Sequence, residues 1–322
     1  MTTAIKFEHV KKYFASKLVV NDLNLDIHQG ELFVLVGNSG SGKTTSIKMI
    51  NRLKEPSEGN ILVNNRKVTD YNLRSLRWNI GYVFQQNALF PNMTVAENIA
   101  LVPMLKGEQI NQQQMVERLL HDVGLDAERF YNRYPKDLSG GEQQKIGILR
   151  AIAANPQIIL MDEPFSALDP LARNNLQNLV LDLHRKMNNT IVFVTHDMNE
   201  AFKLADRIGI MKNGKLVQVD QPQTILSHPA NSFVEDFFHG SMVNGFYETP
   251  VSQACLLLKL NPKPHNLFDN LITIDERISL AQVLQFLSKA KEIRIQDQNN
   301  KCQGYIDHQW LIEYLNIIRI NK

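Results

Sequence analysis

The sequence predicts an α/β fold built around a parallel β-sheet. Short, nearly uninterrupted apolar runs occupy residues 32–36, 158–161 and 191–194. Such runs are typical of strands that are buried on both faces of a parallel sheet. A helical pattern over 171–187 separates the second run from the third, and this strand–helix–strand order indicates parallel pairing. A length of 322 residues suits one large domain and one small one.

The other elements of the first 240 residues are predicted from periodicity. Alternation of apolar and polar residues predicts strands, and apolar residues spaced three and four apart predict helices. The elements follow in chain order: two antiparallel strands within 4–28, a helix over 44–53, strands at 61–63 and 81–84, and helices over 111–123 and 143–153.

The composition changes near residue 240, where we place a domain boundary. Residues 1–240 form the expected large domain. Residues 241–270 contain three prolines and several asparagines, which predicts a linker with one short helix. Residues 271–322 predict a small unit of β-α-β-β-α order with a hairpin around Asn299 and Asn300.

The bulk composition argues against several classes of protein. A net charge of +2 gives no general attraction to nucleic acid or anionic lipid, so we expect no nucleic-acid partner. No apolar run approaches the roughly 18–20 residues that span a bilayer, and the N-terminus lacks the apolar segment of a secretory signal. Cys255 and Cys302 are far apart, fit a reducing compartment, and are expected to be buried.

A glycine-rich loop after the first apolar run predicts a binding site for a nucleoside triphosphate. Its glycines let backbone N–H groups turn toward phosphates, and the helix that follows adds positive partial charge. Lys43 should reach the β- and γ-phosphates, and the Thr44 hydroxyl should bind Mg²⁺. A flexible turn would not need this Lys-Thr ending. The loop and its next residue comprise Gly37, Asn38, Ser39, Gly40, Ser41, Gly42, Lys43, Thr44 and Thr45.

Two acidic residues, Asp162 and Glu163, end the buried strand predicted at 158–161. Asp162 is placed to hold Mg²⁺ through water, and Glu163 is the expected general base for the water that attacks the γ-phosphate. An acidic pair also occurs at ordinary strand ends. The phosphate loop upstream is what favours the functional interpretation.

A second candidate for phosphate binding precedes the helix predicted at 143–153. Ser139 suits a helix N-cap, and Gly140 and Gly141 let backbone N–H groups approach an anion. The alternative is a well-capped helix start with no ligand. A second such helix start in a chain that already has a phosphate loop indicates a site completed by another subunit.

With these motifs, residues 1–240 resemble the nucleotide-binding subunit of an ATP-binding cassette (ABC) transporter. The resemblance implies a P-loop NTPase fold with a RecA-like α/β core, an antiparallel β subdomain and an α-helical subdomain. The family's motifs match in order: the phosphate loop at 37–44, the Q-loop at Gln85, the signature at 138–142 with Glu142, the Walker B strand at 158–163, the D-loop at 166–169 with Asp169, and the switch histidine at His196.

The resemblance also implies a head-to-tail homodimer that sandwiches two ATP molecules with Mg²⁺. Ser139, Gly140, Gly141 and Glu142 would then act on the nucleotide held by the partner's phosphate loop, with Asp169 near the same interface. His196 and Gln85 would act with Glu163, and Gln85 would also approach Mg²⁺. Phe14 is the best match for the aromatic residue that stacks on adenine, and Tyr13 is the second candidate. Lys145 departs from the usual arginine and loses its planar fork.

Several stretches are similar to the ATPases of uptake systems for glycine betaine, carnitine or choline. They are residues 48–53 with Glu55 and Pro56, then 80–83, 161–170 and 230–234. The alternative is a generic importer ATPase with shared residues, for methionine, other amino acids or polyamines. The family implies transmembrane permease subunits, an extracytoplasmic substrate-binding protein or domain, and a peripheral location on the cytoplasmic face of the membrane. A soluble, non-transport ABC ATPase is the rival of another class, but it would normally carry two cassettes or a coiled-coil insertion.

Residues 271–318 resemble one cystathionine-β-synthase-type (CBS) module, most clearly at 304–307. Such modules usually occur in pairs, and 241–270 is too short for a full copy, so it is a linker or a reduced remnant. The resemblance implies a regulatory unit that senses ionic strength at the membrane or binds a cyclic dinucleotide or an adenylate, and the alternative is a dimerisation unit without ligand. Nine basic and eight acidic residues in 241–322 argue against a polybasic lipid sensor.

Overall fold

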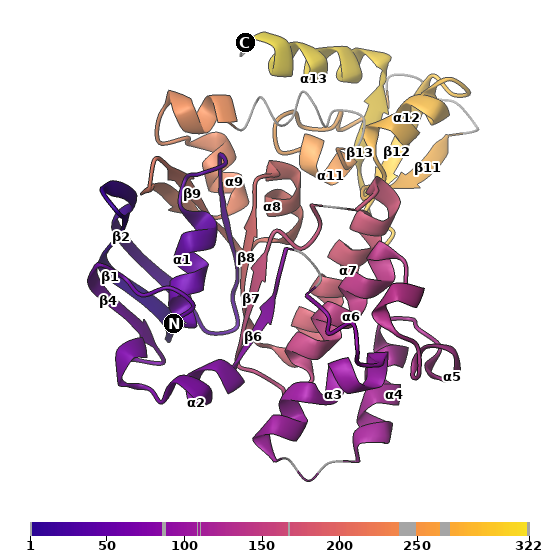
Figure 1. Cartoon of the computed structure of the whole chain (residues 1–322). Coiled ribbons are helices and arrows are strands. Elements are labelled where there is room, and N and C mark those ends of the chain that lie inside the picture. Colours follow the sequence, from indigo (N-terminus) through magenta and orange to yellow (C-terminus); the bar gives the residue numbers. More distant parts are fainter. Residues whose placement is uncertain are drawn as a thin grey trace. The chain divides into compact units, whose positions relative to one another are not determined.

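The computed structural model describes residues 2–85, 88–107, 109, 111–166, 168–237, 249–264 and 271–320 (Figure 1). The chain divides into two compact units, Met1–His196 with Leu204–Val219 and Asp197–Lys203 with Asp220–Lys322. The domain boundary predicted near residue 240 falls within the last of these ranges and stays a prediction.

A six-stranded sheet forms the centre of the first unit, in the order β10-β9-β3-β8-β7-β6. The pairs β3–β8, β3–β9, β7–β8 and β6–β7 are parallel, and every residue of β3, β7 and β8 is buried. The prediction of buried parallel strands is therefore confirmed. The strands are β3 (Leu32–Gly37), β6 (Ile80–Val83), β7 (Ile158–Asp162), β8 (Thr190–Thr195), β9 (Arg207–Lys212) and β10 (Lys215–Asp220).

A second, antiparallel sheet has the order β2-β1-β4-β5. One cluster of buried side chains takes members from both sheets and from helix α1, for example Phe7, Ile47 and Leu35. The two sheets and α1 therefore share a core. Because α1 packs into this core, its first turn is held directly after the loop that follows β3. The elements are β1 (Thr3–Phe14), β2 (Lys17–His28), α1 (Lys43–Ile50), β4 (Glu58–Val63) and β5 (Arg66–Lys67).

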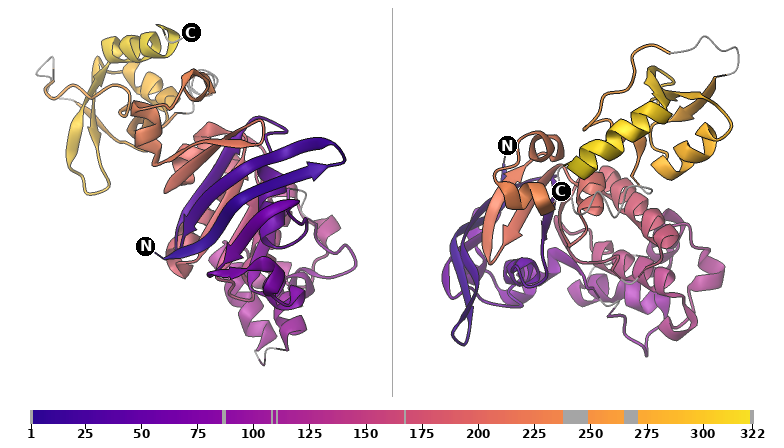
Figure 2. Two further views of the ribbon diagram at one scale, coloured as in Figure 1. Left: turned by 90° about the vertical axis from the view of Figure 1, so that its left-hand side faces the viewer. Right: turned by 90° about the horizontal axis from the view of Figure 1, so that it is seen from above.

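Helices α3 to α6 gather on one side of this unit, and the antiparallel sheet lies on the other (Figures 1 and 2). Their starts carry side-chain caps, with capping boxes at Thr94 and Ser139. The helices predicted at 111–123, 143–153 and 171–187 are confirmed. The helices are α2 (Leu73–Trp78), α3 (Val95–Lys106), α4 (Gln112–Asp122), α5 (Ala127–Phe130), α6 (Gly140–Ile152) and α7 (Pro170–Met187).

The second unit contains a three-stranded sheet of order β11-β12-β13, in which β11 and β12 are parallel and β12 and β13 antiparallel. Its own cluster of buried side chains includes Val283, Ile295 and Trp310, whose ring stacks on Tyr314. The predicted β-α-β-β-α order is confirmed. It consists of β11 (Ile272–Asp275), α12 (Leu280–Leu287), β12 (Glu292–Gln296), β13 (Cys302–Asp307) and α13 (His308–Ile320), preceded by α8 (Met198–Leu204), α9 (Pro222–Ser227) and the short helix α11 (Val251–Ala254).

The two cysteines differ from expectation, because both are half-buried rather than buried. Cys302 begins β13 opposite Gln296, where the register with β12 shifts, so it lies beside the turn of the hairpin. Cys255 follows α11 and packs against the edge of the second unit's core. Among the described residues, no helix has both the length and the apolar character to cross a membrane.

Candidate nucleotide-binding site

The loop between β3 and α1 can only be built with glycine at two positions. Gly37 has a φ of 156°, and a Cβ there would lie 2.2 Å from the Met211 carbonyl oxygen. Gly42 has a φ of 104°, and its Cβ would lie 2.8 Å from the Val19 carbonyl oxygen. The backbone therefore passes tightly between neighbouring strands before it turns into α1.

The start of α1 is arranged to receive an anion. Gly42 supplies no side-chain cap, and the first turn holds no acidic residue, so the first N–H groups of the helix lack a capping side chain. The Ser41 hydroxyl oxygen is buried and has no hydrogen-bond partner among the described residues. A phosphate oxygen would satisfy both groups.

Lys43 is 4% exposed, and its ammonium donates to the carbonyl oxygens of Gly37 (2.7 Å) and Asn38 (3.1 Å). Burial lowers the pKa of Lys43, and the charges of Glu163 and Asp162 act in the opposite direction. A buried cation whose hydrogen bonds within the described part of the chain go to neutral carbonyl oxygens gains from a phosphate placed in the loop. Asn38, Ser39 and Gly40 are exposed, and the predicted site residue Thr45 is half-buried on α1.

Thr44 and Asp162 meet at the ends of two different elements. The Thr44 hydroxyl donates to Oδ1 of Asp162 at 2.6 Å, and Asp162 is 2% exposed. The other carboxylate oxygen, Oδ2, accepts from the Tyr82 hydroxyl at 3.2 Å and lies 3.5 Å from the Lys48 ammonium. A hydroxyl and a carboxylate are oxygen ligands of the kind that Mg²⁺ prefers, so these residues fit a magnesium site.

The structure brings together Gln85, Glu163 and His196, the three residues predicted to be catalytic. The Gln85 amide donates to Oε2 of Glu163 at 3.4 Å, and Nδ1 of His196 lies 3.2 Å from the same oxygen. Glu163 has a φ of 45°, which is rare for a residue with a side chain, and its N–H donates to the Val194 carbonyl oxygen at 3.0 Å. This backbone bond to β8 holds the carboxylate beside His196, which follows β8.

The signature residues form the capped start of α6. The N–H and hydroxyl of Ser139 donate to Oε2 of Glu142 at 2.7 and 2.8 Å. These bonds lower the pKa of Glu142, and the Ser139 N–H contributes most. A Cβ on Gly140 would meet nothing within 4 Å, and one on Gly141 would make only an ordinary contact with Ala172. The packing of the described residues therefore does not require these glycines.

Asp169 and Phe14 are also predicted site residues, and each has local contacts of its own. Asp169 caps α7 by accepting from the Ala172 N–H at 3.0 Å, and Ala167 of the predicted D-loop lies outside the described residues. Phe14 is 41% exposed, with the ammonium groups of Lys12 and Lys54 at 5.2 and 5.6 Å from its ring centre.

Tyr13, the second adenine candidate, is 36% exposed, so both rings are accessible to a base. Lys145, which departs from the family pattern, donates to the Val123 carbonyl oxygen at 2.9 Å. The side chain is thereby directed to the end of α4.

Sequence reasoning missed Tyr82 and Lys48. The sequence feature that could have indicated Tyr82 is its hydroxyl within the otherwise apolar strand 80–83. The feature that could have indicated Lys48 is its spacing of four residues from Thr44 on one helix, which places both side chains on the same face.

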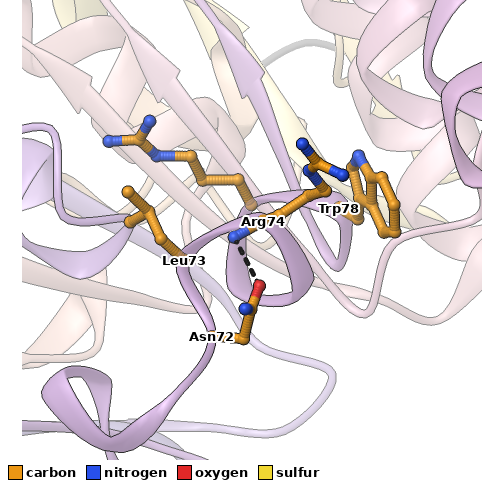
Figure 3. Close-up of a pocket in the computed structure, with 5 residues that line it drawn as sticks. Asn72, Leu73, Arg74 and Trp78 are labelled. Atoms are coloured by element: carbon orange, nitrogen blue, oxygen red, sulfur yellow. Dashed lines mark hydrogen bonds between the residues drawn. The ribbon is translucent and has the colours of Figure 1, made fainter.

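A surface hollow on α2 does not belong to this site. Asn72, Leu73, Arg74, Arg77 and Trp78 line it, and the Asn72 side chain accepts from the Arg74 N–H at 3.0 Å (Figure 3). The Arg74 guanidinium lies beside the Trp78 ring, 5.8 Å from its centre. None of the predicted site residues lines the hollow.

Comparisons with known proteins identify the family. The ABC transporter family model matches residues 20–166. The chain is 46% identical over 305 residues to the carnitine transport ATP-binding protein OpuCA of Listeria monocytogenes, covering 94% of this chain and 75% of that protein. It is 43% identical over 308 residues to the glycine betaine/carnitine/choline transport ATP-binding protein OpuCA of Bacillus subtilis, covering 94% and 78%.

A further relative and a solved structure agree with this family. The osmoprotectant import ATP-binding protein OsmV of Salmonella typhimurium is 49% identical over 239 residues, which cover 72% of this chain and 63% of the relative. The dimeric, post-hydrolysis structure of the ATP-binding cassette MJ0796 with ADP and Pi is 34% identical, with a TM-score of 0.61, and covers 67% of this chain and 98% of that one. The chain therefore belongs to the ABC transporter family, as an ATP-binding subunit with the ABC cassette fold that hydrolyses ATP coupled to transport.

Proposed function

We propose that the chain energises the uptake of quaternary-amine osmoprotectants such as glycine betaine, carnitine or choline. One observation carries the proposal: the similarity to the Listeria carnitine transport protein spans 94% of the chain and so continues past the cassette into the second unit. Importers of amino acids such as methionine, or of polyamines, are the alternative within the family. A soluble ABC ATPase is the alternative of another class.

The residues of the phosphate loop would bind the triphosphate of ATP. Lys43 would transfer its hydrogen bonds from the carbonyl oxygens of Gly37 and Asn38 to the β- and γ-phosphates, and the Ser41 hydroxyl would gain its missing partner. Thr44 and Asp162, with Gln85, would hold Mg²⁺. When bound there, Mg²⁺ neutralises charge on the phosphate oxygens. Phe14 or Tyr13 would stack on the adenine.

Hydrolysis would depend on the group formed by Glu163, His196 and Gln85. Oε2 of Glu163 would accept a proton from the attacking water, whose oxygen forms a bond to the γ-phosphorus while the bond to the β-phosphate oxygen breaks. His196 and Gln85 already contact this oxygen, so both can orient the carboxylate and the water.

The signature residues would complete the site of a second copy in a head-to-tail dimer. Support comes from the solved dimeric cassette that this chain resembles and from the unexplained open space at Gly140 and Gly141. Ser139 and Glu142 would contact the partner's nucleotide, with Asp169 close to the interface. The dimer would bind permease subunits on the cytoplasmic face of the membrane and depend on an extracytoplasmic substrate-binding protein or domain.

The second unit would act as a regulatory domain of the CBS type. Its β-α-β-β-α order supports this assignment. A cyclic dinucleotide or an adenylate is the candidate ligand.

Reconstitution tests the proposed cargo. The chain, its permease and its binding protein are placed in proteoliposomes, and the ATP-dependent uptake of labelled glycine betaine, carnitine, choline, methionine and spermidine is measured. We expect uptake of the quaternary amines and competition among them. Uptake of methionine or spermidine alone would contradict the proposed cargo, and ATP hydrolysis without any transport would favour a non-transport ATPase.

A Glu163→Gln variant tests the proposed base. We expect ATP affinity to be retained and the hydrolysis rate to fall by about 10²–10⁴-fold, the usual contribution of a general base. Binding is measured by calorimetry and turnover by phosphate release. Hydrolysis at the wild-type rate in this variant would refute the role of Glu163.

A further inference from the structure

The two oxygens of the buried Asp162 carboxylate have different partners. Oδ1 accepts from Thr44, the expected metal ligand on α1. Oδ2 faces the Tyr82 hydroxyl at 3.2 Å and the Lys48 ammonium at 3.5 Å. Because the side chain is only 3% exposed, these protein groups rather than bulk water set its orientation.

The register of the sheet fixes Tyr82 in this place. Tyr82 on β6 pairs with Leu160 on β7, and Asp162 follows two residues later. Residues two apart on a strand point to the same face, so Tyr82 and Asp162 are diagonal neighbours there. The Tyr82 ring also packs against the core cluster and lies 4.4 Å from the Phe84 ring centre, which holds the hydroxyl in position.

We propose that Tyr82 is a positioning residue for the metal site, holding Oδ2 of Asp162 so that Oδ1 faces Thr44 and the metal. The torsion that orients a carboxylate is broad and roughly twofold, so the carboxylate turns easily when a partner is removed. Groups that bond to a metal-ligating carboxylate commonly affect metal affinity through its orientation. The inference rests on the proposed magnesium site, and the Lys48 ammonium, 3.5 Å from the same oxygen, assists Tyr82.

The test compares Tyr82→Phe with a matched control, Tyr71→Phe, in the full chain. Both variants lose one hydroxyl and keep the ring. The Tyr71 hydroxyl donates to the Val63 carbonyl oxygen at 2.8 Å, and its ring packs against the same core cluster. Affinity for Mn²⁺ is measured by electron paramagnetic resonance with the non-hydrolysable analogue AMP-PNP bound, and affinity for AMP-PNP alone is measured by calorimetry in EDTA.

For Tyr82→Phe we expect Mn²⁺ affinity to fall about tenfold, with the metal-free affinity for AMP-PNP unchanged. For Tyr71→Phe we expect both affinities to match the wild type. Unchanged Mn²⁺ affinity in Tyr82→Phe would overturn the inference, as would an equal loss of AMP-PNP affinity in EDTA or an equal Mn²⁺ loss in the control. Failure of the wild type to bind Mn²⁺ with AMP-PNP would instead refute the proposed metal site itself.

Discussion

Glu163 holds a strained backbone conformation at the position proposed for the base. Its φ of 45° lies in the left-handed region, which costs a residue with a Cβ about 1–2 kcal/mol. Three hydrogen bonds maintain it: its N–H to Val194, and the N–H and hydroxyl of Ser166 to its carbonyl oxygen. Such strain is often found where a side chain must be aimed at a reaction.

A comparison of Glu163→Gly with Glu163→Ala measures this strain. Both variants lack the carboxylate, so they differ only in the Cβ that the left-handed conformation disfavours. We expect the free energy of unfolding of Glu163→Gly to exceed that of Glu163→Ala by about 1 kcal/mol, measured by denaturant titration, while neither hydrolyses ATP. Equal stability of the two would show that the backbone at this position is relaxed.

At the scale of single elements, α6 begins with two glycines, which helix stability alone does not favour. Alanine is the better helix former by about 1 kcal/mol, and a Cβ on Gly140 would meet none of the described residues within 4 Å. We therefore expect Gly140→Ala to be at least as stable as the wild type in thermal unfolding. The same variant should lower ATP turnover by about a hundredfold, because a Cβ would displace the partner's phosphate.

Gly37→Ala is the contrasting variant for this experiment. Its Cβ would lie 2.2 Å from the Met211 carbonyl oxygen, so thermal stability should fall together with activity. Full activity in Gly140→Ala would argue against close approach of a nucleotide to this helix start.

The sequence predicted most elements, and the exceptions have local causes. The strand β9 was not predicted because Gly209 interrupts its apolar run, and the structure shows why glycine is there: a Cβ would lie 2.7 Å from the Phe33 ring. Helix α1 ends at Ile50, earlier than predicted, because Arg52 adopts a φ of 54°. The family motifs indicated that Gln85 and His196 act with Glu163, and the structure places both side chains beside the Glu163 carboxylate. The contact of Tyr82 depends on strand register, which periodicity does not specify.

At the scale of the whole molecule, each compact unit has a cluster of buried side chains of its own among the described residues. One cluster of buried residues extends from Ala4 to Met211, and another extends from Val251 to Tyr314. Each compact unit also contains one of the chain's two tryptophans, the half-buried Trp78 in the first and the buried Trp310 in the second. The residues proposed to bind ATP for hydrolysis within one chain all belong to the first unit, so ATP bound there should stabilise that unit.

Unfolding followed by tryptophan fluorescence tests this separation. Trp310→Phe leaves Trp78 to report on the first unit, and Trp78→Phe leaves Trp310 to report on the second. We expect two urea transitions, and ATP with Mg²⁺ at a hundredfold excess over its Kd should stabilise the first by about 2.7 kcal/mol. A separate shift of the second transition would report binding of the adenine nucleotide to the second unit itself. The Glu163→Gln background prevents hydrolysis during the titration. Coincident transitions that ATP shifts together would show instead that the two cores unfold as one cooperative unit.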